Sequence, residues 1–139
     1  MKILDTAVLI DIDRGNDDTL DKVRRLDEEG KHAISIVSVT ELYLGLDKKY
    51  EKDSGDYERA TADLEKLISR FEVLPIDRPV AVTGAKIIAD LQNRGEPLHD
   101  LHDVYIGATA KTRQLTVLTP NLSHFERIED VRVQDWSEY

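Results

Sequence analysis

Short apolar runs alternate with longer amphipathic stretches along the chain, and this alternation constrains the fold more than any other feature. The runs 2–4, 33–37, 72–77, 115–119 and 131–136 have the length of strands, and the stretches between them carry apolar residues at helical spacing. Strands separated by helices pair in parallel. We therefore predict an α/β fold, in which a mainly parallel sheet is covered on both faces and residues 1–139 form a single domain.

Capping and terminating residues set the expected limits of the helices. We predict helices over 6–12, from a cap at Asp17 or Asp18 to Gly30, from Ser38 onward, over 57–71, from a cap at Asp77 to Gly95, and over 100–114. Residues 48–58 have a loop composition around 53–56. Gly45 and Gly107 lack side chains, so we expect close helix packing at both.

Composition excludes several classes of protein. The 139 residues contain no cysteine, which rules out disulfides and thiolate metal sites and is compatible with a reducing compartment. The longest apolar runs are far shorter than the roughly 20 residues that a membrane-spanning helix needs. Asp5 and Asp11 interrupt the only candidate for a signal peptide. We expect a cytoplasmic protein that does not enter a membrane.

The formal net charge of −9 argues against general affinity for nucleic acids. Any contact with RNA must therefore be local. Basic residues cluster in three places, around 22–25, 48–52 and 111–113. These clusters are either RNA contacts or solvated helix faces, and composition does not separate the two.

Four oxygen-bearing side chains stand where a strand should end or a helix should begin. Asp5 follows the strand 2–4, Asn121 follows the strand 115–119, and Glu41 and Asp103 lie near the starts of two predicted helices. Ligands of open α/β sheets bind at the carboxyl ends of the strands. Because Mg²⁺ prefers an all-oxygen, mostly anionic environment, this layout predicts a divalent-metal site and favours phosphodiester chemistry.

Each of these residues also has a purely structural explanation. Asp5 can cap the following helix, Glu41 can complete a capping box with Ser38, and Asn121 can bond its own backbone in a turn. Asp103 lies in a first helical turn, where the helix dipole favours an anion whatever its function. The pattern alone leaves both roles open.

Further candidates surround Asp103. Asp100 lies three residues earlier on the same helical face, so it is either another carboxylate ligand or the helix cap. His99 and His102 flank these two acids and would suit a transition metal, but we favour Mg²⁺ or Mn²⁺ with solvated histidines. His124 is a candidate for RNA contact.

Four segments, ILDTAVLI, VSVTELYLG, DVYIGATA and LTVLTPNLSHF, occur in an order and at distances that resemble the motifs of PIN-domain ribonucleases, most closely the VapC type of toxin. The resemblance covers nearly the whole chain and implies an α/β/α sandwich. Carried over residue by residue, it implies that Asp5, Glu41, Asp103 and Asn121 are catalytic and ligate metal, and that Asp100 is a further metal ligand.

The same resemblance implies a cofactor, a reaction and partners. The cofactor is Mg²⁺, with Mn²⁺ as a substitute, and the reaction is endonucleolytic cleavage of RNA such as tRNA or rRNA by water. The partners are an RNA substrate and a VapB-like antitoxin that occupies the active-site groove. Operator DNA is contacted only through the antitoxin, and the toxin is expected to be a homodimer.

Two departures from the family pattern leave an alternative open. Asn121 brings no charge to the site, which favours one tightly held ion over two. Ala7 stands where relatives often have Ser or Asn, leaving Thr6 and Thr119 as the supporting hydroxyls. The alternative is a catalytically weakened PIN-fold module that binds RNA or a protein partner without cleavage. Phosphotransfer is less suitable, since no second acid follows two residues after Asp5.

Overall fold

The described part of the computed structural model, residues 1–96 and 100–139, contains a five-stranded sheet in the order β3-β2-β1-β4-β5. The strands are β1 (Lys2–Leu4), β2 (Ala33–Ser35), β3 (Glu72–Leu74), β4 (Thr116–Thr119) and β5 (Arg132–Asp135). All four pairings are parallel. The predicted α/β fold is confirmed, and β5 lies at the sheet edge as expected.

Helices connect the strands. They are α1 (Thr6–Arg14), α2 (Asp17–Glu29), α3 (Ile36–Lys49), α4 (Gly55–Ser69), α5 (Arg78–Asn93), α6 (Leu101–Arg113), α7 (Leu122–Glu126) and a final 3₁₀ turn, η1 (Trp136–Glu138). None of the helices in these ranges has the length and apolar character needed to cross a bilayer.

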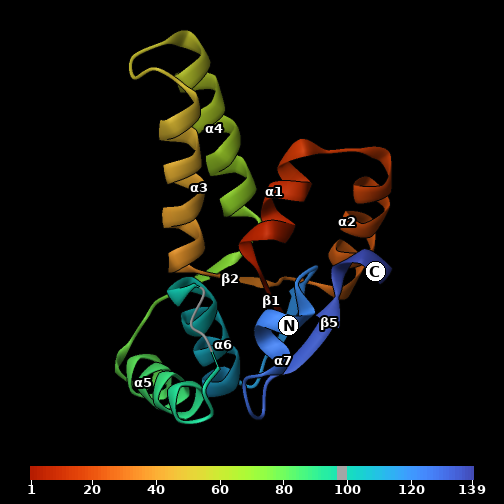
Figure 1. Ribbon diagram of the computed structural model, residues 1–139. Helices are drawn as coiled ribbons and strands as arrows, with labels where there is room; N and C mark the ends of the chain where they lie inside the picture. The colour runs from red at the N-terminus through yellow and green to blue at the C-terminus, as the bar shows by residue number, and fades with distance from the viewer. Residues whose placement is uncertain (97–99) are drawn as a thin grey trace.

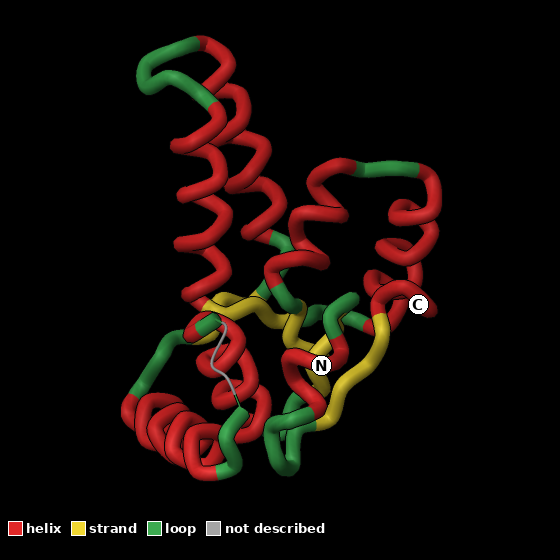
Figure 2. The backbone as a smooth tube through the Cα atoms, viewed as in Figure 1, coloured by secondary structure: helices red, strands yellow, loops and turns green. Residues whose placement is uncertain are grey.

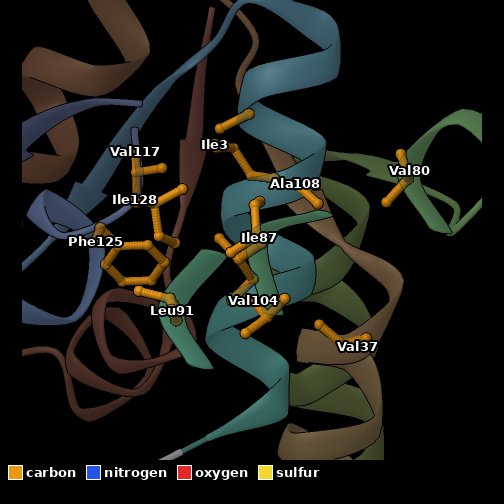
Figure 3. Packing of buried hydrophobic residues seen from close by; sticks show 12 residues of the cluster. Ile3, Val37, Val80, Ile87, Leu91, Val104, Ala108, Val117, Phe125 and Ile128 are labelled. Atoms are coloured by element: carbon orange, nitrogen blue, oxygen red, sulfur yellow. The ribbon is translucent and has the colours of Figure 1, made fainter. Parts of the chain in front are cut away.

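The helices form two layers, one on each face of the sheet (Figure 1). Alternate strand residues pack in the two cores, because successive side chains of a strand point to opposite faces of the sheet. Ile3 and Val117 pack with α5, α6 and α7 on one face, as Figure 3 shows, and Leu4 and Leu118 pack with α1 to α4 on the other. This arrangement is an α/β/α sandwich.

The order of the strands creates a switch point beside β1. The chain first adds β2 and β3 on one side of β1 and later adds β4 and β5 on the other side. The connections therefore diverge where β1 meets β4, and in open α/β sheets ligands bind at the carboxyl ends of strands at such a point. Asp5 and Thr119 occupy those ends.

Helices α3 and α4 form an antiparallel hairpin that extends away from the sheet (Figure 2). Residues 50–54 join them at the far end. The predicted loop over 48–58 is thus shorter than expected, because α3 continues to Lys49 and α4 begins at Gly55. The Ser54 side chain caps α4 by accepting a bond from Tyr57 N–H, which explains the early start.

Two other predicted helix starts were wrong. Asn16 caps α2 in place of Asp17 or Asp18, its side chain accepting a bond from Thr19 N–H at 2.9 Å. Ser35 caps α3 in place of Ser38, by accepting from Val37 N–H at 3.1 Å. The cap at Ser35 ends the strand that was expected to run to 37. The predicted cap at Asp77 is confirmed by its bond from Val80 N–H at 3.1 Å.

The two glycines expected to permit close packing differ. A Cβ on Gly107 would lie 2.6 Å from Ile128 Cδ1, so α6 does approach the segment after α7 closely. A Cβ on Gly45 would meet nothing within 4 Å, since Gly45 is exposed on α3. The packing expectation is confirmed for Gly107 and wrong for Gly45.

We predict opposite effects of alanine at these two glycines. Gly45→Ala should raise the free energy of unfolding by about 0.5–1 kcal/mol, because alanine is the better helix former. Gly107→Ala should lower it by about 1 kcal/mol, because crowding against buried Ile128 outweighs the same helical gain. Chemical denaturation of the two variants measures both effects.

Ile128→Val provides the control, because it removes the Cδ1 atom that the new methyl group would meet. In this background Gly107→Ala should no longer destabilise the fold. A double-mutant cycle with no coupling between positions 107 and 128 would contradict the packing argument.

Candidate functional site

Asp5 lies at the carboxyl end of β1, where the Asp5 N–H extends the β1–β4 pairing by bonding to Leu118 O at 3.0 Å. Its side chain is buried and makes no capping hydrogen bond to α1. Instead Asp5 Oδ2 accepts a 2.8 Å hydrogen bond from Thr119 Oγ1, at the end of β4. Its orientation is therefore set across the switch point by Thr119, while the backbone N–H groups of Thr6 and Ala7 at the start of α1 also favour its charged form.

Glu41 is oriented by the start of α1. Its Oε1 accepts a 2.7 Å hydrogen bond from Thr6 Oγ1, whose oxygen lies 2.9 Å from the Ser38 hydroxyl. The capping-box explanation for Glu41 is wrong, because Ser38 lies inside α3 and Ser35 is the cap. Glu41 thus points from α3 toward the end of β1.

Asp103 and Asp100 reach the site from the start of α6. Asp100 is the N-cap, its Oδ1 accepting from His102 N–H at 2.8 Å, so its structural role is confirmed. Asp103 is buried in the first turn of α6. The distance from its Oδ2 atom to the Nδ1 atom of His124 on α7 is 2.8 Å. The prediction of an RNA contact did not anticipate this partner for His124.

We call Asp5, Glu41, Asp100 and Asp103 the acidic cluster. Burial raises the pKa of Asp5, and the Thr119 hydrogen bond partly opposes this. Burial raises the pKa of Glu41, with the charges of Asp100 and Asp5 adding to the effect. Burial, then the charges of Asp5 and Asp100, raise the pKa of Asp103 to about 6. The acids are close enough to oppose one another's ionisation.

Histidines are the only basic partners of these acids within residues 1–96 and 100–139. His124 contacts Asp103, and His102 Nδ1 lies 3.2 Å from Asp100 Oδ1 and 3.6 Å from Glu41 Oε2. No lysine or arginine in these ranges forms an ion pair with the cluster. A divalent cation would supply the missing positive charge, and the oxygen-rich donor set fits such an ion.

Asn121 is less closely tied to the cluster. Its backbone N–H donates to Thr119 Oγ1 at 2.9 Å, and the same hydroxyl donates to Asp5. The side chain is exposed and makes no capping bond. Among residues 1–96 and 100–139, no hydrogen bond joins the Asn121 side-chain amide to any of the four acids. The structure therefore places Asn121 at the edge of the site through its backbone.

The remaining predictions at the site have mixed outcomes. The supporting roles of Thr6 and Thr119 are confirmed by their hydrogen bonds to Glu41 and Asp5. His102 is 40% exposed but lies against two of the acids, so the expectation of a merely solvated residue was incomplete. His99 lies outside the described residues. Helix α7, which presents His124, was missed because only five residues form it.

A groove of 590 Å³ leads away from Glu41 between α1, α3 and α4. Leu42, Leu46 and Leu64 supply apolar surface. Charged residues also line it, among them Asp13, Arg14, Lys49, Asp56, Arg59 and Asp63. This groove of mixed chemistry therefore borders the acidic cluster at Glu41.

Comparison with known proteins identifies the family. The model of the PIN domain matches residues 2–131. The chain belongs to the PIN-domain family. Among relatives of this PIN protein, the "tRNA(fMet)-specific endonuclease VapC" of Salmonella typhimurium is 38% identical over 103 residues, 74% of each chain. "Ribonuclease VapC1" of Methanocaldococcus jannaschii is 32% identical over 128 residues, 92% of this chain and 81% of the relative.

Solved structures agree with this assignment. DNA-bound VapBC from Salmonella typhimurium superimposes with a TM-score of 0.81 at 33% identity, covering 98% of this PIN chain and 99% of that one. VapBC2 from Rickettsia felis, bound to a promoter DNA fragment, has a TM-score of 0.83 at 21% identity and supports the fold alone. Within the PIN family, the chain groups with the VapC ribonucleases.

Removing the Thr119 hydroxyl should weaken metal binding without unfolding the protein. Thr119→Val keeps the shape of this fully buried side chain but removes the donor to Asp5. We expect a loss of about 10–100-fold in Mn²⁺ affinity by calorimetry, the usual scale for a partner that orients a ligand. Thr119→Ser keeps the donor and should retain most of the affinity. Equal affinities for the Val and Ser variants would contradict the orienting role.

Asp103→Asn should stabilise the metal-free protein. Because the folded pKa of Asp103 is raised to about 6, ionisation destabilises the fold as the pH rises from about 4 to about 6, and the full cost persists at neutral pH. The amide removes this cost and can still accept the His124 bond. We expect a gain of roughly 1–2 kcal/mol at about pH 7.5, less than the full shift would give because the site opens to solvent.

Urea denaturation in the presence of a chelator measures this gain. It should shrink at about pH 4.5, where Asp103 of the folded wild type is protonated. A variant that is less stable than the wild type at neutral pH would contradict the charge-crowding account.

Proposed function

We propose that this protein is a metal-dependent endoribonuclease, the toxin of a VapBC-type toxin–antitoxin module. The supporting observation is the acidic cluster at the switch point, where buried carboxylates are oriented by hydrogen bonds and have only histidines as basic partners. Its VapC relatives are named as ribonucleases. Structural ion-pair networks would place Lys or Arg among such acids, and the described residues place none there.

We propose Mg²⁺ as the ion, with Mn²⁺ as a substitute. Asp5, Glu41 and Asp103 would hold it, with Asp100 and Asn121 as additional ligands. When bound, such an ion makes a water molecule more acidic and stabilises negative charge on a phosphate. Its charge would also offset the repulsion from Asp5 and Asp100, which adds to the effect of burial on the pKa of Asp103.

The protein's own residues would orient the reaction. Thr119 and Thr6 hold Asp5 and Glu41, so the carboxylates need little rearrangement when RNA arrives. Glu41 lines the groove, and its proposed role is to orient the attacking water. The expected products carry a 5′-phosphate and a 3′-hydroxyl. The catalytic set we propose is Asp5, Glu41, Asp103 and Asn121.

The substrate we propose is structured RNA such as tRNA or rRNA, cut where the strand is unpaired and its phosphates are accessible. The net charge of −9 opposes binding to RNA, so local basic residues must offset it. Arg14, Lys49 and Arg59 line the groove that begins at Glu41, and they are suitably placed to contact a phosphate backbone.

The protein partner we propose is a VapB-like antitoxin, through which operator DNA would be contacted. Relatives of this chain have been solved as VapBC complexes bound to DNA. The apolar residues that line the groove suit an apolar segment of the antitoxin, and Glu41 in the same lining suits a basic side chain. The family resemblance leads us to propose a homodimer as well.

Cleavage of total tRNA tests the proposed activity. The wild type should cut with Mg²⁺ or Mn²⁺ and stop when a chelator is added. Asp5→Asn should reduce the rate at least about a hundredfold, the scale of losing a group that stabilises transition-state charge. Asp18→Asn makes the same charge change on the exposed start of α2 and should cut normally.

Circular dichroism controls for folding of both variants. Full activity in Asp5→Asn would contradict the ligand assignment. Wild-type protein that binds Mn²⁺ but cuts no RNA would favour the other candidate, a PIN-fold module that binds without cleavage. The observation that supports this candidate is the exposed Asn121 side chain, for which the described residues show no hydrogen bond to the four acids.

A further inference from the structure

His102 gives the outer part of the acidic cluster a nitrogen donor. One potential ligand atom from each of Glu41, Asp100 and His102 lies within 4.8 Å of the other two. Atoms bound to a single ion at about 2.0–2.2 Å are separated by at most about 4.4 Å. Small side-chain rotations would therefore close the three residues around one cation.

The local contacts prepare these side chains for such an ion. Glu41 Oε1 is held by Thr6, and Oε2 is the oxygen that faces His102 Nδ1 at 3.6 Å. Asp100 is fixed against the first turn of α6 by its bond from His102 N–H. The Glu41, Asp100 and His102 side chains are 26%, 41% and 40% exposed, so an ion can reach them from solvent.

The donor types differ between the two ends of the cluster. The inner end, around Asp5 and Asp103, offers carboxylate oxygens, which suit Mg²⁺. The outer end adds an imidazole, a donor that suits transition metals much better than Mg²⁺. Two acids with no Lys or Arg partner in residues 1–96 and 100–139 also need a positive charge there.

We propose that Glu41, Asp100 and His102 form a second cation site, and that His102 makes it selective for a divalent transition-metal ion over Mg²⁺. This inference rests on the proposed function in that the two share Glu41 and Asp100, whereas His102 belongs to the outer site alone. In the complete site, the inner acids would accept Mg²⁺ and the outer site would take an ion such as Zn²⁺ or Co²⁺. A merely structural His102, bonded to Asp100, would create no preference between ions.

Titration of the purified protein with Co²⁺ tests the proposal without any RNA. We expect two Co²⁺ ions to bind per chain. Calorimetry measures the number bound, and visible absorption reports Co²⁺ coordinated by nitrogen. Excess Mg²⁺ should displace one ion and leave the other. His102→Asn retains a polar side chain but loses the imidazole, so the Mg²⁺-resistant ion should bind at least about tenfold more weakly.

Two further variants keep the test specific. Asp100→Asn retains a good helix cap and should lose the same ion, because its carboxylate is a ligand. Asp18→Asn removes the same charge from an exposed position on α2 and should bind two ions like the wild type. Circular dichroism verifies the fold of each variant, and Mg²⁺ affinity at the inner site should not change in His102→Asn.

The possible outcomes separate this inference from the proposed function. If His102→Asn binds both Co²⁺ ions as the wild type does, or if Mg²⁺ displaces both equally, the nitrogen-containing site is refuted. If the wild type binds only one Co²⁺ ion and still cleaves RNA, this inference fails and the ribonuclease proposal stands. If two ions bind as expected and no RNA is cut, the ribonuclease proposal fails.

Discussion

Crowding of negative charge at the carboxyl ends of β1 and β4 is the constraint on which the candidate site depends. Asp5, Glu41, Asp100 and Asp103 come from three separate parts of the chain. Burial raises the pKa of Asp5, Glu41 and Asp103, and the charges of neighbouring acids add to the shift at Glu41 and Asp103. This arrangement of acids does not by itself stabilise the fold. It is tolerated because the rest of the sandwich is well packed, and a bound cation would turn the repulsion into attraction.

Hydrogen bonds from elements of both layers convert this crowding into a defined geometry. Thr119 orients Asp5 across the switch point, Thr6 orients Glu41, and His124 contacts Asp103 from α7. Each partner lies at the end of a strand or in a first helical turn, where small shifts of the backbone are opposed by the sheet on one side and the core on the other. These bonds hold the acids in place, and the groove beside α3 and α4 borders them at Glu41.

The sequence predicted the architecture well because apolar periodicity reports directly on burial. Alternating strands and helices gave the parallel sheet, and Asp5 was placed correctly because a buried strand ends before it. Details that depend on tertiary contacts were not accessible. The cap of α3 depends on Ser35 and not on Ser38, and the contact of His124 with Asp103 depends on a five-residue helix with no periodicity to detect. The approach of His102 to Glu41 joins α6 to α3, a tertiary contact that local sequence does not report.

The central claim is that remote acids converge on one divalent ion, and a crystal soaked in Mn²⁺ tests it most directly. The account predicts an anomalous peak at roughly 2.0–2.2 Å from carboxylate oxygens of both Asp5 and Asp103. A fully soaked crystal whose Mn²⁺ ions lie only at surface acids, with Asp5 and Asp103 contacting none of them, would contradict it.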